Sequence, residues 1–121
     1  MPFELRVTPG EFLARVRGWG SDDFASTTEA IRRIGEDPRL LPGMPVLMDV
    51  RELDYLATPP EVTRFAAGPQ FLAGHRVALL VRRGTQFGVA KSFVEKSGGA
   101  DERIEVFAEP ELAAAWIKAR E

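Results

Sequence analysis

The chain has 121 residues, a length typical of one domain, and 45% of them are hydrophobic and 28% charged, as in ordinary globular proteins. Its formal net charge of −2 argues against a dedicated nucleic-acid binder, which normally carries a basic excess. The chain contains no cysteine, so disulfides, thiolate metal sites and cysteine nucleophiles are excluded. No apolar run approaches the ~20 residues of a membrane span, and residues 3–7 lack the apolar core of a signal peptide. We therefore expect one cytoplasmic domain over residues 1–121, without a membrane span.

The N-terminal segment predicts an antiparallel hairpin. Residues 3–7 alternate apolar and polar side chains, which is typical of a strand with one buried face. After the turn at Pro9-Gly10, residues 12–17 alternate in the same way, and Gly18-Trp19-Gly20 is expected to end the second strand. We interpret Trp19 as a ring folded over the sheet edge. The alternative is a surface aromatic at a partner contact.

A first helix is predicted to begin at Ser21, with the hydroxyl as N-cap and Asp22 and Asp23 in the positive first turn. It ends before Asp37-Pro38. Helical spacing predicts an inner face made of Phe24, Thr28, Ile31 and Gly35, with Ala25 and Ile34 beside it.

The central stretch, residues 45–58, predicts a buried strand, its exit loop and the start of a helix. The apolar run after Pro45 is short and stops at Asp49, as in a strand buried on both faces. Thr58 and Glu61 have the spacing of a capping box, and Pro59 stands at the first helical position.

The second half predicts a strand over residues 76–81, a helix capped by Thr85, a strand over 104–107 and a final helix opened by Pro110. The expected inner face of the helix after Thr85 is Phe87, Ala90, Val94 and Ser97, with Gly98-Gly99 as its end, and the final helix shares a face of Leu112, Ala115, Trp116 and Ala119. The resulting order is β-β-α-β-α-β-α-β-α. This alternation predicts an α/β fold whose sheet is mainly parallel with an antiparallel edge hairpin.

Ligand sites of such sheets lie beyond the carboxyl ends of the strands, where this chain places Asp49, Arg51 and Arg82. Because their strands are expected to be neighbours, Asp49 and Arg82 are predicted to come close enough to pair. They then line a ligand crevice, or form a salt bridge or solvated charges at the strand ends.

The turn Arg82-Arg83-Gly84-Thr85 is a candidate anion site. Two guanidinium groups precede the free backbone N–H groups of a helix N-terminus, an arrangement that favours anions. The alternative is a basic, solvated turn, and the spacing is not that of a phosphate-binding Walker loop.

The sequence offers little for catalysis. His75 is the one histidine, and it stands before a predicted strand with no identifiable nucleophile or acid partner. A zinc site built from one histidine and carboxylates alone is poor. We therefore expect a protein that is not an enzyme and that carries no metal and no cofactor.

Three stretches resemble the STAS-like (SpoIIAA-like) family, whose fold is that of the anti-sigma-factor antagonists, and in particular its small stand-alone bacterial branch, which is also likened to CRAL-TRIO lipid-transfer domains. They are VRGWGSDDF at 16–24, VLMDVREL at 46–53 and EVFAEPELAAAWI at 105–117. The order of elements matches over nearly the whole chain. The resemblance implies a non-catalytic binding or regulatory domain.

Antagonists of this family carry a serine that is phosphorylated at the start of the helix after the central strand. Here the region reads DYLATPPEV at 54–62, without the Ser-Ser-Gly of the antagonists, and Thr58 lies nearest to the phosphorylated position. The resemblance makes Thr58 a candidate phosphosite, whereas the capping box with Glu61 gives it a structural role.

Two functions follow from this sequence. The first is a regulatory module that contacts an unidentified protein partner through the surface from Arg51 to Glu61, with the turn at 82–86 beside it. The second, the alternative to it, is a carrier of a small apolar molecule or lipid, in a cavity between helices and sheet lined by Phe65, Phe71, Phe87 and Phe93. The same four rings are also what an ordinary core would contain, and the sequence favours that interpretation of them. The sequence leaves the oligomeric state open.

Overall fold

Five strands form one mixed sheet in the spatial order β1-β2-β3-β4-β5, and four helices pack on it. The computed structural model describes residues 3–67, 72–97 and 103–119. In chain order the elements are β1 (Phe3–Val7), β2 (Ala14–Ser21), α1 (Phe24–Gly35), β3 (Val46–Asp54), α2 (Pro59–Ala67), β4 (Val77–Leu80), α3 (Thr85–Lys96), β5 (Ile104–Phe107) and α4 (Pro110–Lys118). Only the β1–β2 pair is antiparallel, and the other three pairs are parallel. The predicted fold class and element order are confirmed.

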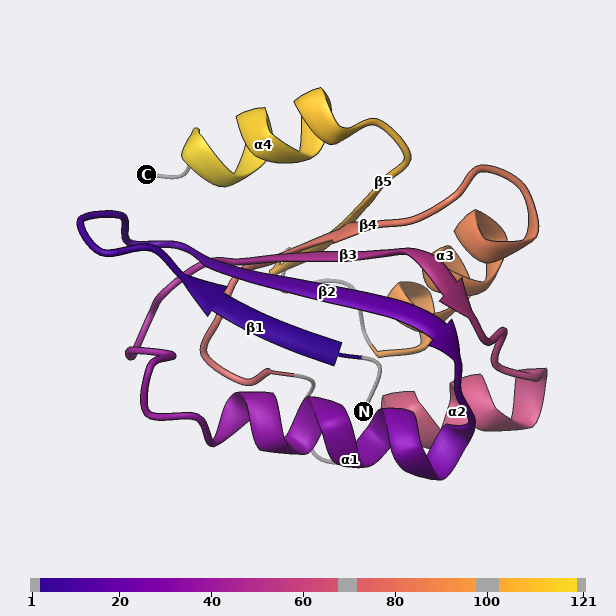
Figure 1. The fold of residues 1–121 in the computed structure, drawn as a ribbon. Coiled ribbons are helices and arrows are strands. Elements are labelled where there is room, and N and C mark those ends of the chain that lie inside the picture. The colour runs from indigo at the N-terminus through magenta and orange to yellow at the C-terminus, as the bar shows by residue number, and fades with distance from the viewer. Residues whose placement is uncertain (1–2, 68–71, 98–102, 120–121) are drawn as a thin grey trace.

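The helices divide unequally between the two faces of the sheet. Figure 1 shows α1, α2 and α3 on one side of the strands and α4 on the other. The main core lies under the first three helices and takes the alternate strand positions, among them Val16, Met48 and Leu79. A smaller cluster lies under α4, where Ala113 and Ile117 pack on Ala78. Because α4 packs on β3, β4 and β5, the α4 side of β1 and β2 is left uncovered.

The second strand runs further than its glycines suggest. β2 continues through Trp19 and Gly20 to Ser21, where it pairs with the far half of β3, so the predicted end at Gly18 is wrong. The ring of Phe3 on β1 lies against Gly18, where an added Cβ would come within 2.8 Å of it. Glycine is therefore required here for packing rather than for ending the strand.

The first helix starts two residues later than predicted and is rotated. Its N-cap is Asp23, whose Oδ1 accepts from the backbone N–H of Ser26 at 2.8 Å, whereas Ser21 still belongs to β2. Thr28 and Gly35 of the predicted inner face are exposed, as is Ala25. The buried residues of α1 are Thr27, Ala30 and Ile34.

The later helices show similar shifts. The N-cap of α3 is Gly84 rather than Thr85, and Gln86 and Ala90 are its buried residues while Ser97 is exposed. The predicted end at Gly98-Gly99 lies outside the described residues. In α4 the buried residues are Ala113 and Ile117, whereas the predicted Leu112, Ala115 and Ala119 are exposed and Trp116 is half-buried.

The start of α2 is as predicted. The backbone N–H of Thr58 donates to Glu61 Oε1 at 3.0 Å, and the N–H of Glu61 donates to Thr58 Oγ1 at 3.3 Å. This reciprocal pair is a capping box, with Pro59 as the first helical residue. It fixes the loop that leads from β3 into α2.

Candidate functional site

The central strand β3 is longer than its neighbour β4 and projects beyond it. β4 pairs with β3 only from Val46 to Asp49, whereas β2 follows β3 as far as Asp54. The backbone carbonyls of the projecting end therefore lack a strand on the β4 side. Buried carbonyls without a partner cost free energy, so another group is expected to bind them.

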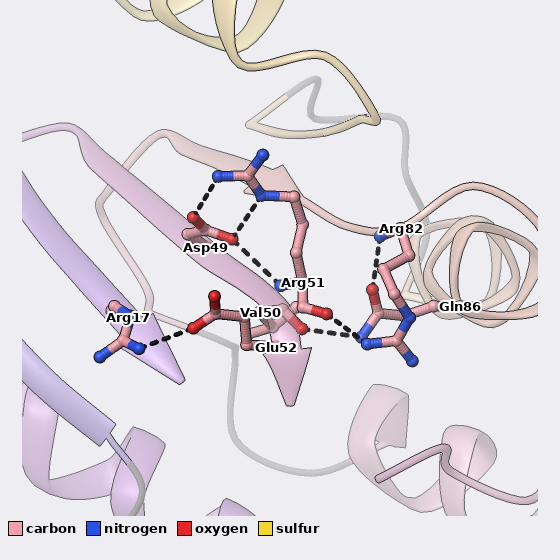
Figure 2. Close-up of polar contacts among 7 residues, drawn as sticks. All are labelled: Arg17, Asp49, Val50, Arg51, Glu52, Arg82 and Gln86. Atoms are coloured by element: carbon pink, nitrogen blue, oxygen red, sulfur yellow. Dashed lines mark hydrogen bonds and ion pairs between the residues drawn. The ribbon is translucent and has the colours of Figure 1, made fainter. Parts of the chain in front are cut away.

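Arg82, in the turn before α3, and Gln86, in the first turn of α3, supply these hydrogen bonds (Figure 2). The Arg82 guanidinium donates to the carbonyls of Arg51 and Leu53, the latter at 3.1 Å. Gln86 Nε2 donates to the carbonyl of Val50 at 2.8 Å, and Gln86 Oε1 accepts from the Arg82 backbone N–H at 2.5 Å. Arg82 and Gln86 thus extend the sheet edge where β4 has ended.

Asp49 binds the arginine on its own strand. Figure 2 shows its carboxylate facing Arg51, whose Nε and Nη2 lie 3.0 and 2.8 Å from its two oxygens. Burial alone would raise the pKa of Asp49, but the hydrogen bonds from the Arg51 side chain and backbone outweigh it, so the pKa is lowered. The expected Asp49–Arg82 pair does not form, because residues two apart on a strand share a face and Arg51 is nearer.

The uncovered face of β1–β3 carries several such pairs. Arg17 Nη2 lies 2.6 Å from Glu52 Oε1, Arg15 lies 2.6 Å from Glu11, and Arg6 lies 3.2 Å from Glu4. An open groove of about 340 Å³ lies among these side chains, with Leu47 and Leu80 in its lining. Among the described residues, four arginines and two carboxylates line the groove, and each of these arginines pairs with a carboxylate, two of them with Glu11 and Glu52 outside the lining.

The predicted anion turn is exposed, and both of its guanidinium groups have protein partners. Arg82 binds the carbonyls of β3, and Arg83 pairs with Glu109 before α4. Gly84 and Thr85 begin α3 and are exposed to solvent. An anion site at the backbone N–H groups of the α3 N-terminus therefore stays a prediction. The two guanidinium groups that were expected to contribute to it are bound to other parts of the protein.

An apolar pocket of about 130 Å³ lies between the sheet and the three helices on the covered face. The sheet contributes side chains from β1, β3 and β4, and the helices contribute side chains from α1, α2 and α3. The apolar lining includes Met48, Val50, Leu79 and Val81 from the sheet, and Ile31, Val62, Phe65, Val89, Ala90 and Phe93 from the helices. No charged side chain lines it among the residues that the structure describes.

Aromatic rings connect the helices around this pocket. The Phe65 ring on α2 contacts Phe24 of α1 at a centroid distance of 4.7 Å and Phe93 of α3 at 6.5 Å. Of the four phenylalanines predicted to line a cavity, Phe65 and Phe93 do so. Phe87 instead packs against the main core, and Phe71 lies outside the described residues.

The loop from β3 to α2 closes one end of the pocket. Tyr55, Leu56 and Ala57 line it, and the Tyr55 hydroxyl donates to Glu61 Oε1 at 2.9 Å. Thr58 follows at the exposed start of α2, where its side chain caps the helix. Glu61 thus accepts hydrogen bonds from both the Thr58 N–H and the Tyr55 hydroxyl. The sequence predicted its role in the capping box but not its bond to Tyr55.

Sequence reasoning also missed Gln86. It is 6% exposed and occupies the same helical face as Ala90, four residues on. A polar residue at a core-facing position normally has hydrogen-bond partners, and that periodicity would have singled Gln86 out. The same holds for Thr27, which is buried on α1 and lines the pocket.

The remaining candidates have structural surroundings. His75 is buried, and its Nδ1 lies 2.8 Å from the carbonyl of Met44. Trp19 is half-buried with the Arg17 guanidinium 4.7 Å from its ring centroid. Within residues 3–67, 72–97 and 103–119, no three metal-binding side chains are grouped, and no helix there has the length and apolarity to cross a membrane.

Comparison with known proteins shows the fold. An uncharacterised protein of the DUF3478 family from Shewanella loihica PV-4, described as having a SpoIIAA-like fold, superposes with a TM-score of 0.58. The match covers 95% of this chain and 91% of that one, at 13% sequence identity. This chain has the SpoIIAA-like fold. No family model and no curated protein matches the sequence.

The likeness extends over nearly the whole chain. At 13% identity it establishes the SpoIIAA-like fold and says nothing about conserved side chains. The Shewanella protein is itself uncharacterised. Function must therefore be argued from the side chains of this chain.

Proposed function

We propose that this protein is a non-catalytic, cytoplasmic binding module that holds a small apolar molecule in the pocket between the sheet and α1–α3. The observation that supports this proposal most directly is the volume of about 130 Å³ within an almost wholly apolar lining. A cavity needs only about 10–15 Å³ of the same measure to hold one water molecule, and an apolar cavity of about 150 Å³ binds benzene. The pocket is therefore large enough for a ligand and unattractive to water.

The rings of Phe65 and Phe93 add a reason for preferring an organic ligand. They stand on two different helices and contact each other, so a ligand between helices and sheet touches aromatic surface on one side and aliphatic side chains on the other. Ligand sites are commonly apolar and aromatic with few polar groups. This arrangement supports the carrier function, which the sequence offered as the alternative to protein contact.

Native mass spectrometry of gently purified protein, compared with the mass after denaturation, tests the proposal. We expect an extra mass that disappears on denaturation. The variant Val89→Phe fills the pocket from α3 and should lose that mass, whereas Lys91→Phe, on the exposed side of the same helix, should retain it. Filling an existing cavity normally keeps or raises the melting temperature, so an unfolded Val89→Phe would be recognised.

A bare mass for the native protein, together with identical solvent extracts from the native protein and Val89→Phe, would contradict the carrier function. The same spectrum reports whether the protein is a monomer or a dimer. Native conditions preserve both kinds of complex, so one sample answers the two questions.

Contact with a protein partner is the second candidate function. Arg82 hydrogen-bonds to Arg51 and Leu53, which brings the two segments of the predicted partner surface side by side. Leu56, in the same loop, is 41% exposed. A partner captured from host lysate by the native protein should not be captured by the Leu56→Glu variant. The same partner, once purified, should bind the native protein directly. If Leu56→Glu captures it equally well, the predicted surface is not where the partner binds.

A phosphate on Thr58 is part of this second candidate. The Thr58 side chain is exposed at the N-terminus of α2, where a phosphate is electrostatically tolerated. The phosphate would place negative charge beside the Glu61 carboxylate, which accepts from the Thr58 N–H and the Tyr55 hydroxyl, and this repulsion would loosen the loop at the pocket end. Intact-mass measurement of protein from its native host would reveal the modification.

A further inference from the structure

The two hydroxyl groups that line the apolar pocket both donate their hydrogen to a carboxylate of the protein. Thr27 Oγ1 donates to Asp22 Oδ2 at 2.5 Å, and the Tyr55 hydroxyl donates to Glu61 Oε1 at 2.9 Å. A hydroxyl has one donor, so each retains only lone pairs for a ligand. Toward the pocket both groups therefore act as acceptors.

The amide group in the lining is likewise occupied by the protein. Gln86 Oε1 accepts from the Arg82 backbone N–H, and Gln86 Nε2 donates to the carbonyl of Val50. Moving Gln86 toward a ligand would leave those two backbone groups without partners. The pocket thus presents no cation, and at most one side-chain donor, the second N–H of Gln86 Nε2, among the described residues that line it.

The charges behind the two hydroxyl groups are negative, whereas the Arg82 guanidinium lies at the projecting end of β3, bound to the carbonyls of Arg51 and Leu53. Burial raises the pKa of Tyr55, and the hydrogen bond to Glu61 and the charges of Glu61, Asp23 and Asp22 raise it further. Arg64, which acts on Glu61, has its guanidinium over the Phe24 ring, 4.4 Å from the centroid, and does not line the pocket. A carboxylate entering the pocket would meet lone pairs and negative charges.

We propose that the pocket selects compact, uncharged aromatic or aliphatic molecules and rejects carboxylates, including fatty acids. This inference rests on the proposed carrier function and names its ligand class. Burying a carboxylate with no cation and at most one N–H donor beside it is expensive. The volume of about 130 Å³ suits a ligand close to benzene in size, and a long acyl chain does not fit within it.

The experiment compares three probes that differ in charge or length: toluene, benzoate and laurate. Each is titrated at pH 7 while the methyl NMR signals of Ile31, Val62 and Val89 are followed, because these side chains line the pocket. We expect toluene to move them to saturation and benzoate to bind at least about tenfold more weakly. Laurate should give no saturable shift at these methyl groups.

Val89→Phe should abolish the toluene shifts at Ile31 and Val62, and Lys91→Phe should preserve them. Benzoate or laurate binding as tightly as toluene would overturn the ligand class and leave the carrier function standing. If no probe binds, the proposed function itself fails. The two failures are therefore distinguishable in one set of titrations.

Discussion

The two faces of the sheet use the same strands in opposite ways. On the covered face, Val16, Met48 and Leu79 point under α1–α3 and form the main core around an apolar pocket. On the uncovered part of the other face, alternate residues of the same strands are charged and paired, as with Arg17 and Glu52. The alternation of side chains along these strands therefore gives the sheet one buried, apolar face and one face with solvent-exposed charges.

The difference between the two faces shows where a ligand can gain binding free energy. Apolar surface in the pocket is removed from water when a ligand enters, which is favourable at roughly 25 cal/mol per Å². The arginines of the open face already have carboxylate partners in solvent, so a partner there would have to replace existing pairs. We therefore expect function on the covered face to depend on volume, and the open face to tolerate substitution.

The largest expected effect is loss of packing on the covered face. Met48 is 2% exposed, and Met48→Ala should lower the free energy of unfolding by about 2–4 kcal/mol, because it removes a buried side chain and leaves a larger cavity. Arg17→Ala, on the neighbouring strand and the opposite face, should cost less than about 1 kcal/mol. Urea unfolding of both variants measures the difference. Equal losses would refute the division between the faces.

The next effect lies where the projecting end of β3 meets α3. Gln86→Leu keeps the size of the side chain but leaves the Arg82 N–H and the Val50 carbonyl without their partners. We expect a loss of about 1–3 kcal/mol in the free energy of unfolding. Faster amide exchange at Arg82 should accompany it.

Thr85→Val is the matched control for Gln86→Leu. Thr85 precedes Gln86, is exposed and makes no side-chain cap to α3, whose N-cap is Gly84. The change should stay within about 0.5 kcal/mol, as for surface positions in general. A loss near 1 kcal/mol would instead support the N-cap that the sequence predicted for Thr85.

Most of the fold could be predicted from local patterns in the sequence. Alternation identified β1, and the Thr58–Glu61 spacing gave the start of α2 to the residue, because a capping box is complete within four residues. The end of β3 was missed because Arg51, Glu52 and Asp54 are charged and the strand beyond Asp49 pairs only with β2. Their strand character comes from a neighbour far away in the sequence.

Helix orientation and the site depended on packing that the sequence does not display. Thr27 rather than Thr28 is buried, since a shift of one residue rotates a helix by a quarter of a turn or so. In α4 the small Ala113 faces Ala78, whereas the larger Leu112 is 55% exposed, because close approach to the sheet favours a small side chain. Asp49 was expected beyond the end of its strand but lies within β3, where Arg51 binds it, and Arg82 binds backbone carbonyls of β3 instead.

The smallest expected effect concerns the pairing of Asp49 with Arg51 on the open side. Burial opposes ionisation of Asp49, but the hydrogen bonds from Arg51 prevail, so its pKa lies below the ordinary value of 3.8. A carboxyl group whose pKa is lower in the folded state stabilises that state above its unfolded pKa. This contribution is lost as the pH falls from 3.8 through the lower folded value.

Asp49→Asn removes that ionisation while keeping a side-chain oxygen as acceptor for Arg51. The native protein should be the more stable of the two at pH 6, and the difference should shrink toward pH 2. Because the Asp49 and Arg51 side chains are 29% and 40% exposed, solvent screens the pair and the difference at pH 6 should be less than about 1 kcal/mol. Urea unfolding of both proteins at constant ionic strength measures it. A difference that widens as the pH falls would mean that Asp49 is ionised more easily in the unfolded chain, which would contradict the hydrogen bonding described here.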